Sequence, residues 1–367
     1  MNKMIVANLV HRPIRSLISV VAIAVEVTLI LVIVGLSMGM LKDTAQRQAG
    51  IGADVMVKPP GSSFIGSLSS APVSMKVANV LEKVPHVQAV TPVLTQFNTS
   101  GAVEILYGID LKSFENMGGP FRYLEGGPFE GPNDILVDDF YAASKNFKVG
   151  DHIELLNHDF RICGIVENGK GARKFMPIQT VQDLIGAEGK ASIFYVKLDD
   201  PKNSDAVVAA IKHVPGMEKY GVQSLKEWMS LMTPGNIPGF SAFIDVVIGV
   251  AVCIGFIVIF QSMYTAVMER TREIGILKSM GASKAYVVGL ILRETVLLAV
   301  LGIATGIALS YAARAGILHQ FPTLRVAVEM EWVIKATIIA LVGALLGAAY
   351  PAYRAAQKDP IDALAYE

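Results

Sequence analysis

Charged residues are scarce in this chain of 367 residues: Asp, Glu, Lys and Arg make up 17%, while hydrophobic residues make up 52%. The 32 basic and 32 acidic side chains also cancel, so the formal net charge is zero. Binding to nucleic acid relies on an excess of positive charge, and we therefore expect no nucleic-acid partner. A chain this apolar is instead typical of a protein that lies partly in a membrane.

Cysteines and catalytic motifs are equally sparse. Cys163 lies in a polar region and Cys253 in an apolar run, so we expect no disulfide between them. The sequence contains no GxxxxGK[ST], HExxH or GxSxG, and the glycine-rich NGKGARK at residues 168–174 lacks the spacing of a P-loop. We interpret that stretch as a basic hairpin tip, in preference to a contact with phosphate or a lipid headgroup. We expect a non-catalytic protein with no catalytic residue, metal or cofactor of its own.

Four apolar runs approach or exceed the roughly 20 residues that cross the hydrocarbon core of a membrane. They cover residues 17–40, 246–268, 295–313 and 336–353. The first run is too long for a signal peptide and no small-x-small cleavage site follows it, so we interpret it as a retained anchor. Glycine pairs spaced by four predict close approach between helices; they are Gly35 with Gly39, Gly302 with Gly306, and Gly343 with Gly347.

Basic residues on the short flanks predict the orientation. Residues 1–15 and 269–284 are rich in Lys and Arg, which favours the cytoplasm for both under the positive-inside rule. The stretch 314–335 also holds three basic residues, although Glu329 and Glu331 lie among them. We expect a multi-pass protein of the cytoplasmic (inner) membrane, with both termini cytoplasmic and the large domain periplasmic or extracellular.

Residues 41–240 separate the first two runs and must fold outside the cytoplasm. Patterns of alternation and of helical periodicity are mixed there, which predicts an α+β domain. We predict strands at 53–58, 103–109, 135–137, 152–156, 160–166 and 192–198, helices at 74–84, 181–186 and 204–213, and a mobile loop at 61–70. The predicted fold class is a membrane all-α four-helix region plus an extracytoplasmic α+β domain inserted between the first and second transmembrane helices.

These patterns divide the chain into nine segments. In order they are an interfacial helix (1–15), the first span (16–41), the extracytoplasmic domain (42–239), the second span (240–268), a helix or loop (269–284), the third span (285–313), a short loop (314–332), the fourth span (333–353) and a cytoplasmic tail (354–367).

The segment 269–284 is charged and amphipathic. Ile274, Leu277 and Met280 recur at helical spacing and predict one apolar face. Pairs one turn apart can form, Glu269 with Arg272 and Arg270 with Glu273. The wet face consists of Glu269, Arg270, Arg272, Glu273 and Lys278. The pattern is typical of a helix along a membrane surface, and a solvated loop is the alternative.

Glu26 is an ionisable residue near the middle of the first span. A carboxyl there costs on the order of 3 kcal/mol on insertion scales, which the surrounding apolar residues offset. A functional role in the helix bundle and a protonated structural glutamate are both open. Its candidate partners are Gln261, the other intramembrane polar residue of interest, and Thr28 of a second copy.

Four segments carry the pattern of a known family: ERTREIGILKSMGAS at 269–283, RETVLLAVLGIATGIALS at 293–310, PAYRAAQKDPIDALAYE at 351–367 and NLVHRPIRSLIS at 8–19. In these segments the chain resembles the permease subunits of MacB, LolC and FtsX type ABC transporters, the four-span type VII mechanotransmission family. The domain between the first two spans resembles the family's core domain in outline, through ILVDDFYAASKNFKVGDHIEL at 135–155.

The resemblance implies a dimer of permeases on two copies of a cytoplasmic ABC ATPase, which binds the ATP and Mg²⁺. It implies that the segment between the second and third spans docks on that ATPase. The residues carried over to this coupling role are Glu269, Arg270, Arg272, Glu273, Ile274, Leu277, Lys278 and Met280. Closure of the ATPases would then move the outer domains through the first and second helices.

Two functions fit the resemblance. The first is export or extraction of an amphiphilic cargo such as a lipoprotein, lipid, peptide or drug. The second is an FtsX-like signalling permease that activates an extracytoplasmic partner, such as a cell-wall hydrolase, without transporting cargo. The implied partners also include a second permease copy or paralogue, a membrane-fusion adaptor or other extracytoplasmic protein, and membrane lipids.

Overall fold

The computed structural model describes residues 13–62, 71–98, 104–237 and 239–358, and it divides the chain into two compact units. The first unit, the helix bundle, holds Met1–Gly39, Pro238–His319 and Leu324–Glu367. The second, the inserted domain, holds Met40–Ile237 and Gln320–Thr323. Most of the interfacial helix, the loop 61–70 and the tail expected from the sequence lie outside the described residues.

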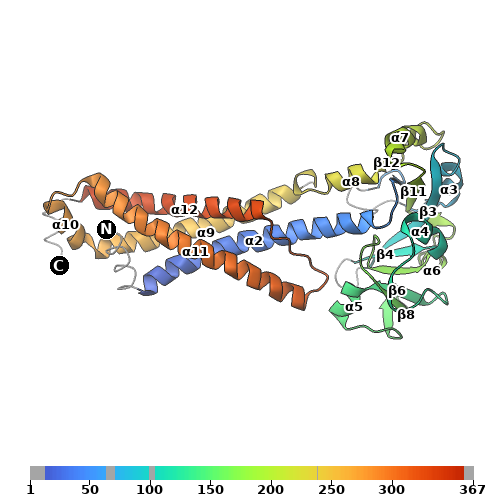
Figure 1. The fold of residues 1–367 in the computed structure, drawn as a ribbon, viewed down its shortest axis with the longest axis horizontal. Coiled ribbons are helices and arrows are strands. Elements are labelled where there is room, and N and C mark those ends of the chain that lie inside the picture. Colours follow the sequence, from blue (N-terminus) through green and yellow to red (C-terminus); the bar gives the residue numbers. More distant parts are fainter. Residues whose placement is uncertain (1–12, 63–70, 99–103, 238, 359–367) are drawn as a thin grey trace. The chain divides into compact units, whose positions relative to one another are not determined.

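The described part of the helix bundle is built from long helices (Figure 1). They are α2 (Pro13–Ala49), α9 (Phe240–Glu269), α11 (Lys284–Gln320) and α12 (Met330–Gln357), with the short α10 (Thr271–Ser279) between α9 and α11. The four long helices are apolar and long enough to cross a membrane, which confirms that part of the predicted fold class. α11 extends beyond the predicted end of the third span at 313, and α2 continues from the bundle into the inserted domain.

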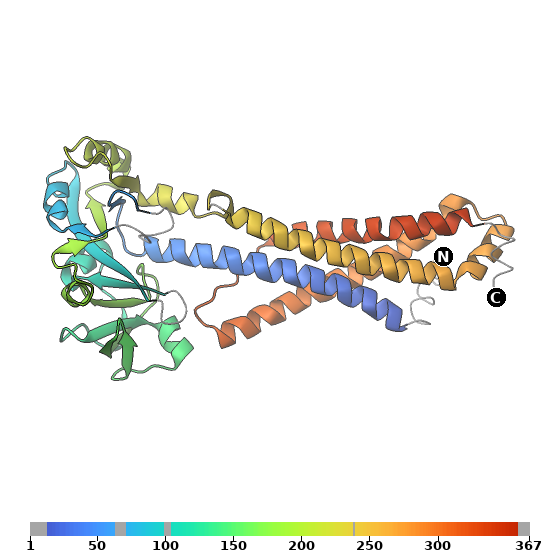
Figure 2. The same ribbon diagram turned by 180° about the vertical axis from the view of Figure 1, so that it is seen from behind.

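α12 packs along α9, and both views show these two helices side by side (Figures 1 and 2). A Cβ at Gly347 of α12 would lie 3.1 Å from the carbonyl oxygen of Phe256 in α9. From residue 336 to residue 352, every fourth residue of α12 is a fully buried alanine. The row comprises Ala336, Ala340, Ala344, Ala348 and Ala352. Side chains this short allow two helix backbones to approach closely, which is how helices associate in lipid.

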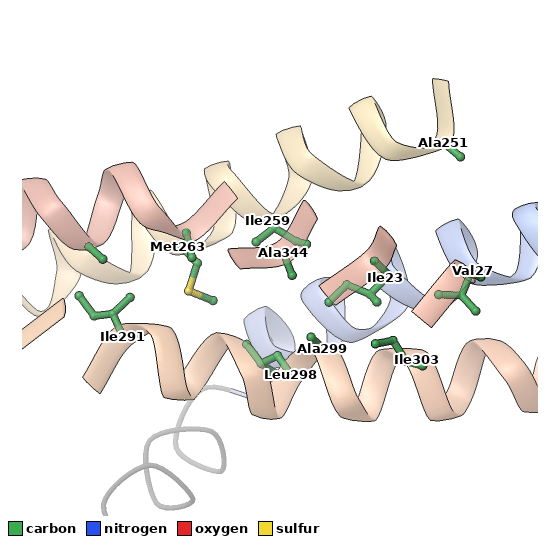
Figure 3. Packing of buried hydrophobic residues seen from close by; sticks show 14 of the residues in the cluster. Ile23, Val27, Ala251, Ile259, Met263, Ile291, Leu298, Ala299, Ile303 and Ala344 are labelled. Carbon is green, nitrogen blue, oxygen red and sulfur yellow. The ribbon is translucent and has the colours of Figure 1, made fainter. Parts of the chain in front are cut away.

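The glycine pair of α11 packs against α2. A Cβ at Gly302 would lie 2.7 Å from the Cβ of Ile23, and a Cβ at Gly306 would lie 2.7 Å from the carbonyl oxygen of Ala24. Figure 3 shows Ile23 and Val27 of α2 facing the neighbouring residues of α11 in the same buried cluster. The predicted close approach is therefore present at this pair.

The pair Gly35 and Gly39 contacts the segment that connects α11 to α12. A Cβ at Gly39 would lie only 2.0 Å from the carbonyl oxygen of Arg325, and Ala327 N–H donates to the carbonyl of Gly35 at 2.8 Å. These glycines accommodate the extended segment that precedes α12, so the expectation that they bring two helices together is wrong.

A 10-stranded mixed sheet forms the centre of the inserted domain, in the order β12-β1-β11-β3-β4-β9-β6-β8-β5, with β7 paired to β8. Neighbours are antiparallel except for β4 with β9 and β6 with β8. The strands are β1 (Val55–Lys58), β3 (Val87–Asn98), β4 (Glu104–Ile109), β5 (Tyr123–Gly126), β6 (Asp134–Asp138), β7 (His152–Leu155), β8 (His158–Val166), β9 (Lys174–Pro177), β11 (Ile193–Leu198) and β12 (Gly221–Ser224). A two-stranded ribbon joins β2 (Val73–Ser74) to β10 (Lys190–Ala191).

Short helices connect these strands, and the domain is of the α+β class, as predicted. Two of them begin at aspartates whose side chains accept a backbone N–H, Asp110 from Ser113 and Asp138 from Tyr141. Asn203, which precedes α7, makes no such bond with its side chain. The helices are α3 (Lys76–Leu81), α4 (Leu111–Gly118), α5 (Asp139–Lys145), α6 (Ile178–Ile185), α7 (Ser204–Lys212) and α8 (Leu225–Leu231), with 3-10 turns η1 (Pro201–Asn203) and η2 (Pro234–Asn236).

Candidate functional site

The segment between the second and third membrane helices folds into α10 and a tight turn. The hydroxyl of Thr271 donates to the carbonyl of Met268 at 2.8 Å at the point where α9 ends. Gly281 has a φ of +95°, which glycine adopts without strain and which ends the helical segment. Ser283 then accepts the N–H of Tyr286 at 3.2 Å and caps the start of α11.

One face of α10 is directed at the chain's own helices. Arg270 forms an ion pair with Glu294 of α11 at 3.0 Å, and the two side chains are only 14% and 11% exposed. Ile274 is buried in the bundle cluster. Lys278 donates to the carbonyls of Ala356 (3.0 Å) and Lys358, where its charge complements the carboxyl end of α12.

These contacts change how the predicted coupling residues are interpreted. Arg270 pairs with Glu294, not with Glu273 as the sequence led us to expect. Arg270, Ile274 and Lys278 hold α10 to the bundle, and that role accounts for each of them without a partner protein. Leu277 is partly buried on the same side.

The opposite face of α10 is exposed. Arg272, Glu273 and Ile276 are exposed in α10, as are Glu269 at the end of α9 and Met280 just after α10. We call these residues the exposed stripe. Met280 is 72% exposed and Ile276 is 43% exposed, which is a large apolar contribution for a charged surface.

The sequence interpretation missed Ile276 because it joined Ile274, Leu277 and Met280 into one apolar face. Ile274 and Met280 are six positions apart, which rotates one from the other by about 240° around a helix. The two therefore lie on different faces, and Ile276, one turn before Met280, is the apolar neighbour of Met280. The rotation of about 100° per residue, applied from Met280, would have identified Ile276 in the sequence.

Glu26 is buried within the bundle, with 3% of its surface exposed. Its Oε2 lies 2.0 Å from the position that a Cβ on Gly255 of α9 would take, and its Oε1 lies 4.0 Å from the corresponding point on Gly343 of α12. Oε1 has no hydrogen-bond partner among the described residues. The carboxyl therefore occupies a notch that exists because residue 255 is glycine, whereas Gly343 borders the carboxyl at ordinary van der Waals distance.

Of the two candidate partners of Glu26, Gln261 lies in the same chain and Thr28 in a second copy. Gln261 is exposed on the surface of α9. Thr28 donates within its own chain, to the carbonyls of Ala24 (2.6 Å) and Gly306 (3.0 Å). A separate polar link joins α2 to α9, between the hydroxyls of Ser19 and Ser262 at 2.6 Å.

The end of α2 is embedded in the sheet of the inserted domain. Gln48 donates to the hydroxyl of Tyr107 at 2.8 Å and accepts from the hydroxyl of Tyr195 at 2.8 Å, and the two tyrosine oxygens are 3.2 Å apart. Tyr195 is fully buried, and this burial raises its pKa well above the ordinary value. The Tyr195 phenol therefore remains neutral, and the two tyrosine hydroxyls form a closed ring of hydrogen bonds with the Gln48 amide.

Glycines complete this attachment, which we call the helix socket. A Cβ at Gly50 would lie 1.9 Å from the carbonyl oxygen of Gly169. Gly52, with a φ of +80°, approaches Gly118 so closely that a Cβ there would lie 2.4 Å from its Cα. Ile51 between them is fully buried. No side chain could be added at either glycine without moving backbone, so the helix end and the domain form a tight fit.

Comparison with known proteins matches both parts of the chain. Residues 16–214 match the family model described as MacB-like periplasmic core domain, and residues 246–360 match the one described as FtsX-like permease C-terminal. The Macrolide export ATP-binding/permease protein MacB of Aggregatibacter actinomycetemcomitans is 26% identical over 334 residues, covering 84% of this chain and 52% of that protein. The protein of the same name from Mannheimia succiniciproducens is 25% identical over 403 residues, covering 100% of this chain and 60% of its own length. This chain thus spans only 52% to 60% of these two relatives.

Two solved structures resemble the inserted domain at low identity. The periplasmic region of MacB from Actinobacillus actinomycetemcomitans aligns at 19% identity with a TM-score of 0.38, covering 50% of this chain and 94% of that one. The extracellular domain of the noncanonic ABC-type transporter YknZ from Gram-positive bacteria aligns at 14% identity with a TM-score of 0.36, covering 47% and 98%.

Proposed function

Because the chain belongs to the family of ABC-transporter permeases that have a MacB-like periplasmic core domain and an FtsX-like C-terminal region, we propose that it converts ATP hydrolysis by a separate ATPase subunit into movement of its inserted domain. The family membership confirms the resemblance found in the sequence. The observation that carries the proposal is α2, one helix of 37 residues that starts in the bundle and ends in the helix socket. A helix of that length extends about 55 Å, well beyond a hydrocarbon core of about 30 Å.

A continuous helix transmits displacement because its backbone hydrogen bonds resist bending and stretching. The residues after the apolar run, from Lys42 to Ala49, keep the helical hydrogen-bonding pattern up to the socket. There the ring of Gln48, Tyr107 and Tyr195 and the tight glycine contacts prevent the helix end from sliding over the sheet. A shift of α2 is therefore passed to the strands β4 and β11 that carry the tyrosines.

In this proposal the ATPase, which binds ATP and Mg²⁺, docks on the exposed stripe of α10. Ile276 and Met280 provide an apolar centre, and Glu269, Arg272 and Glu273 provide charges around it, a composition suited to a protein interface. We expect two ATPase copies and two permease copies in the assembly, with both chain termini on the ATPase side of the membrane.

A double substitution on the exposed stripe tests the docking. We expect Arg272→Glu combined with Met280→Glu to abolish co-purification with the ATPase and its stimulated hydrolysis, while membrane insertion is unchanged. Arg122→Glu, which reverses an exposed charge in the inserted domain, is the matched control and should have no effect. Wild-type co-purification and hydrolysis in the double variant would refute docking through this face.

Arg270 requires a separate design because it has a partner inside the bundle. Arg270→Glu should destabilise the bundle by leaving Glu294 beside a second carboxylate, and the swap Arg270→Glu with Glu294→Arg should restore it. If Arg270 contacts the ATPase directly, the swap will restore thermal stability and leave stimulated hydrolysis low.

For the transported cargo, we propose an amphiphile such as a lipoprotein, lipid, peptide or drug, which agrees with the macrolide export named for the relatives. An adaptor of membrane-fusion type is then the expected extracytoplasmic partner. Stimulation of ATP hydrolysis by a macrolide in the reconstituted assembly supports export. Stimulation only by an extracytoplasmic protein, with no movement of cargo, would favour a signalling permease.

A further inference from the structure

The stretch NGKGARK, residues 168–174, is not the basic hairpin tip that the sequence predicts, because the strands on either side of it, β8 and β9, are separated by β6 in the sheet. The loop wraps around the end of α2. Gly171 N–H donates to the carbonyl of Arg47 at 2.7 Å, and the guanidinium of Arg47 donates to the carbonyl of Gly171 at 2.8 Å. Gly171 has a φ of +79°, and a Cβ there would lie 2.6 Å from the ring of Tyr107, so only glycine fits. The loop and the helix therefore hold each other through reciprocal bonds.

Arg173, at the end of this loop, joins three separate parts of the chain. Its guanidinium contacts Asp43 of α2 at 3.0 Å and Asp138 at the end of β6 at 2.9 Å. It also donates to the carbonyl of Thr323 at 3.0 Å. Thr323 belongs to the short segment 320–323, which lies in the connection between α11 and α12 and clusters with the inserted domain.

These contacts are sheltered from water. The side chains of Arg173, Asp43 and Asp138 are 15%, 8% and 1% exposed. Arg47 adds a second cation, with its Nε 2.9 Å from the same oxygen of Asp43 that Arg173 contacts. Buried ion pairs are screened little by salt, and removal of one member leaves the others uncompensated.

We propose that Arg173 is a clasp that ties segment 320–323 to the end of α2, so that the connection between α11 and α12 follows α2 when it moves. A guanidinium suits this role because its planar fork of N–H donors reaches two carboxylates and a carbonyl at once. A lysine ammonium keeps the charge but has no such fork. Arg173 is a positioning residue for the proposed transmission, and the mechanical part of the inference rests on that proposed function.

Hydrogen exchange of the full chain in lipid nanodiscs, without any ATPase, tests the contact itself. We expect Arg173→Lys and Arg173→Gln to raise exchange in peptides covering residues 320–327 roughly tenfold, the scale of one lost charge-assisted hydrogen bond. Arg122→Lys is the matched control, because Arg122 is an exposed arginine of the same domain, paired with Glu167. Unchanged exchange at 320–327 in both Arg173 variants would overturn the proposal.

A second variant tests whether an ATP-driven movement of α2 reaches residues 320–327 through Arg173, separately from the local contacts of Arg173. Asp43→Asn removes the charge on α2 that Arg173 contacts but leaves the bonds from Arg173 to Asp138 and Thr323. In the assembly with the co-purifying ATPase, we expect ATP to change exchange at 320–327 in the wild type, and Asp43→Asn to reduce that change at least severalfold while hydrolysis continues. A full ATP-driven change in this variant would show that the clasp transmits nothing.

Different results would refute the proposed transmission through α2 and the Arg173 clasp. If the wild-type assembly shows no ATP-driven change in the inserted domain, the proposed transmission fails, whereas the clasp is still judged by the chain without ATPase. If the Arg173 variants leave 320–327 protected while the wild-type domain does respond to ATP, the clasp alone fails.

Discussion

The helix bundle and the inserted domain reach close packing in opposite ways. Among the most buried positions of the bundle are glycines and alanines, such as Gly302, Gly306 and the alanine row of α12. The inserted domain instead buries large aromatic side chains completely, including Tyr195, Phe114, Phe160, Phe175 and Phe194. In lipid, moving a large apolar side chain from the acyl chains into the protein core changes the free energy of folding little. In water, the burial of such a side chain is a main source of stability. The aromatic core of the domain should therefore be damaged by smaller side chains, and the glycine contacts of the bundle by larger ones.

The largest expected effect is from a cavity in the domain. Phe175 packs against Phe121 and Phe114, with ring centroids 4.9 Å and 6.0 Å away. We expect Phe175→Ala to lower the free energy of unfolding of the domain by about 3 to 5 kcal/mol. Denaturation of the full chain in detergent measures this through Trp228 fluorescence, with Trp332 replaced by Phe. Leu124→Ala, at an exposed apolar side chain, is the control, and an equal loss there would contradict the comparison.

Growth of a side chain in the bundle should have the next largest effect. Gly306→Ala places a methyl group against the backbone of Ala24, which cannot move without shifting α2. We expect a loss of about 1 to 3 kcal/mol of bundle stability, followed through Trp332 with Trp228 replaced by Phe. Gly249→Ala is the matched control, because a Cβ at Gly249 would meet no atom within 4 Å. If both substitutions behave alike, small residues are not what closes the bundle.

The notch around Glu26 gives a second test of whether a larger side chain at a bundle glycine destabilises the bundle. Gly255→Ala would bring a methyl group onto the carboxyl of Glu26, and we expect a cost of about 1 kcal/mol because the buried side chain has little room to turn. Glu26→Ala with Gly255→Ala should recover that cost, so the two substitutions will be non-additive in thermal unfolding. Additive effects would show that the carboxyl does not occupy the notch.

The smallest expected effect is a change in the stability of the inserted domain with pH. Burial raises the pKa of Asp138 from 3.8 to about 6 in the folded state, although Arg173 opposes the shift. A raised carboxyl pKa means that the folded state binds the proton more tightly, so this residue makes the domain more stable as the pH falls through 6. We expect a gain of about 1 kcal/mol between about pH 7 and about pH 5.

Asp138→Asn provides the comparison for that pH effect. Asparagine still caps α5 but does not titrate, so the gain should disappear in this variant. Denaturation midpoints of both proteins at the two pH values measure it. A gain of the same size in Asp138→Asn would assign the effect to another group.

The sequence predicted the membrane helices and the inserted α+β domain well, because long apolar runs and mixed periodicities are local properties. It failed at β3, the longest strand and one at the centre of the sheet. Pro92 lies within that strand, opposite Phe194 of β11, and a proline ordinarily argues against a central strand because it cannot donate to the ladder. The neighbouring strands override this local signal.

The candidate sites were predicted less completely because their contacts are long-range. Segment 269–284 was identified from its charge, but its two faces became distinct only when Glu294 and the end of α12 were seen to occupy one of them. A glycine gives no signal of being the counterpart of a buried carboxyl, so Gly255 could not be inferred as the neighbour of Glu26. The helix socket was missed for the same reason, because Gln48 meets its tyrosines only in the folded sheet.

The unbroken course of α2 also sets a rule for its length. Because the helix reaches Gln48 without a break, one residue inserted between Asp43 and Gln48 would turn that amide by about 100° around the axis relative to Asp43, so the phenol contacts of Gln48 and the Arg173 contact of Asp43 could not both be kept. A whole heptad would bring it back to within about 20° of its starting direction, merely farther along. Insertions and deletions in this stretch of related proteins should therefore come in multiples of about seven residues, which preserve the direction of the side chains.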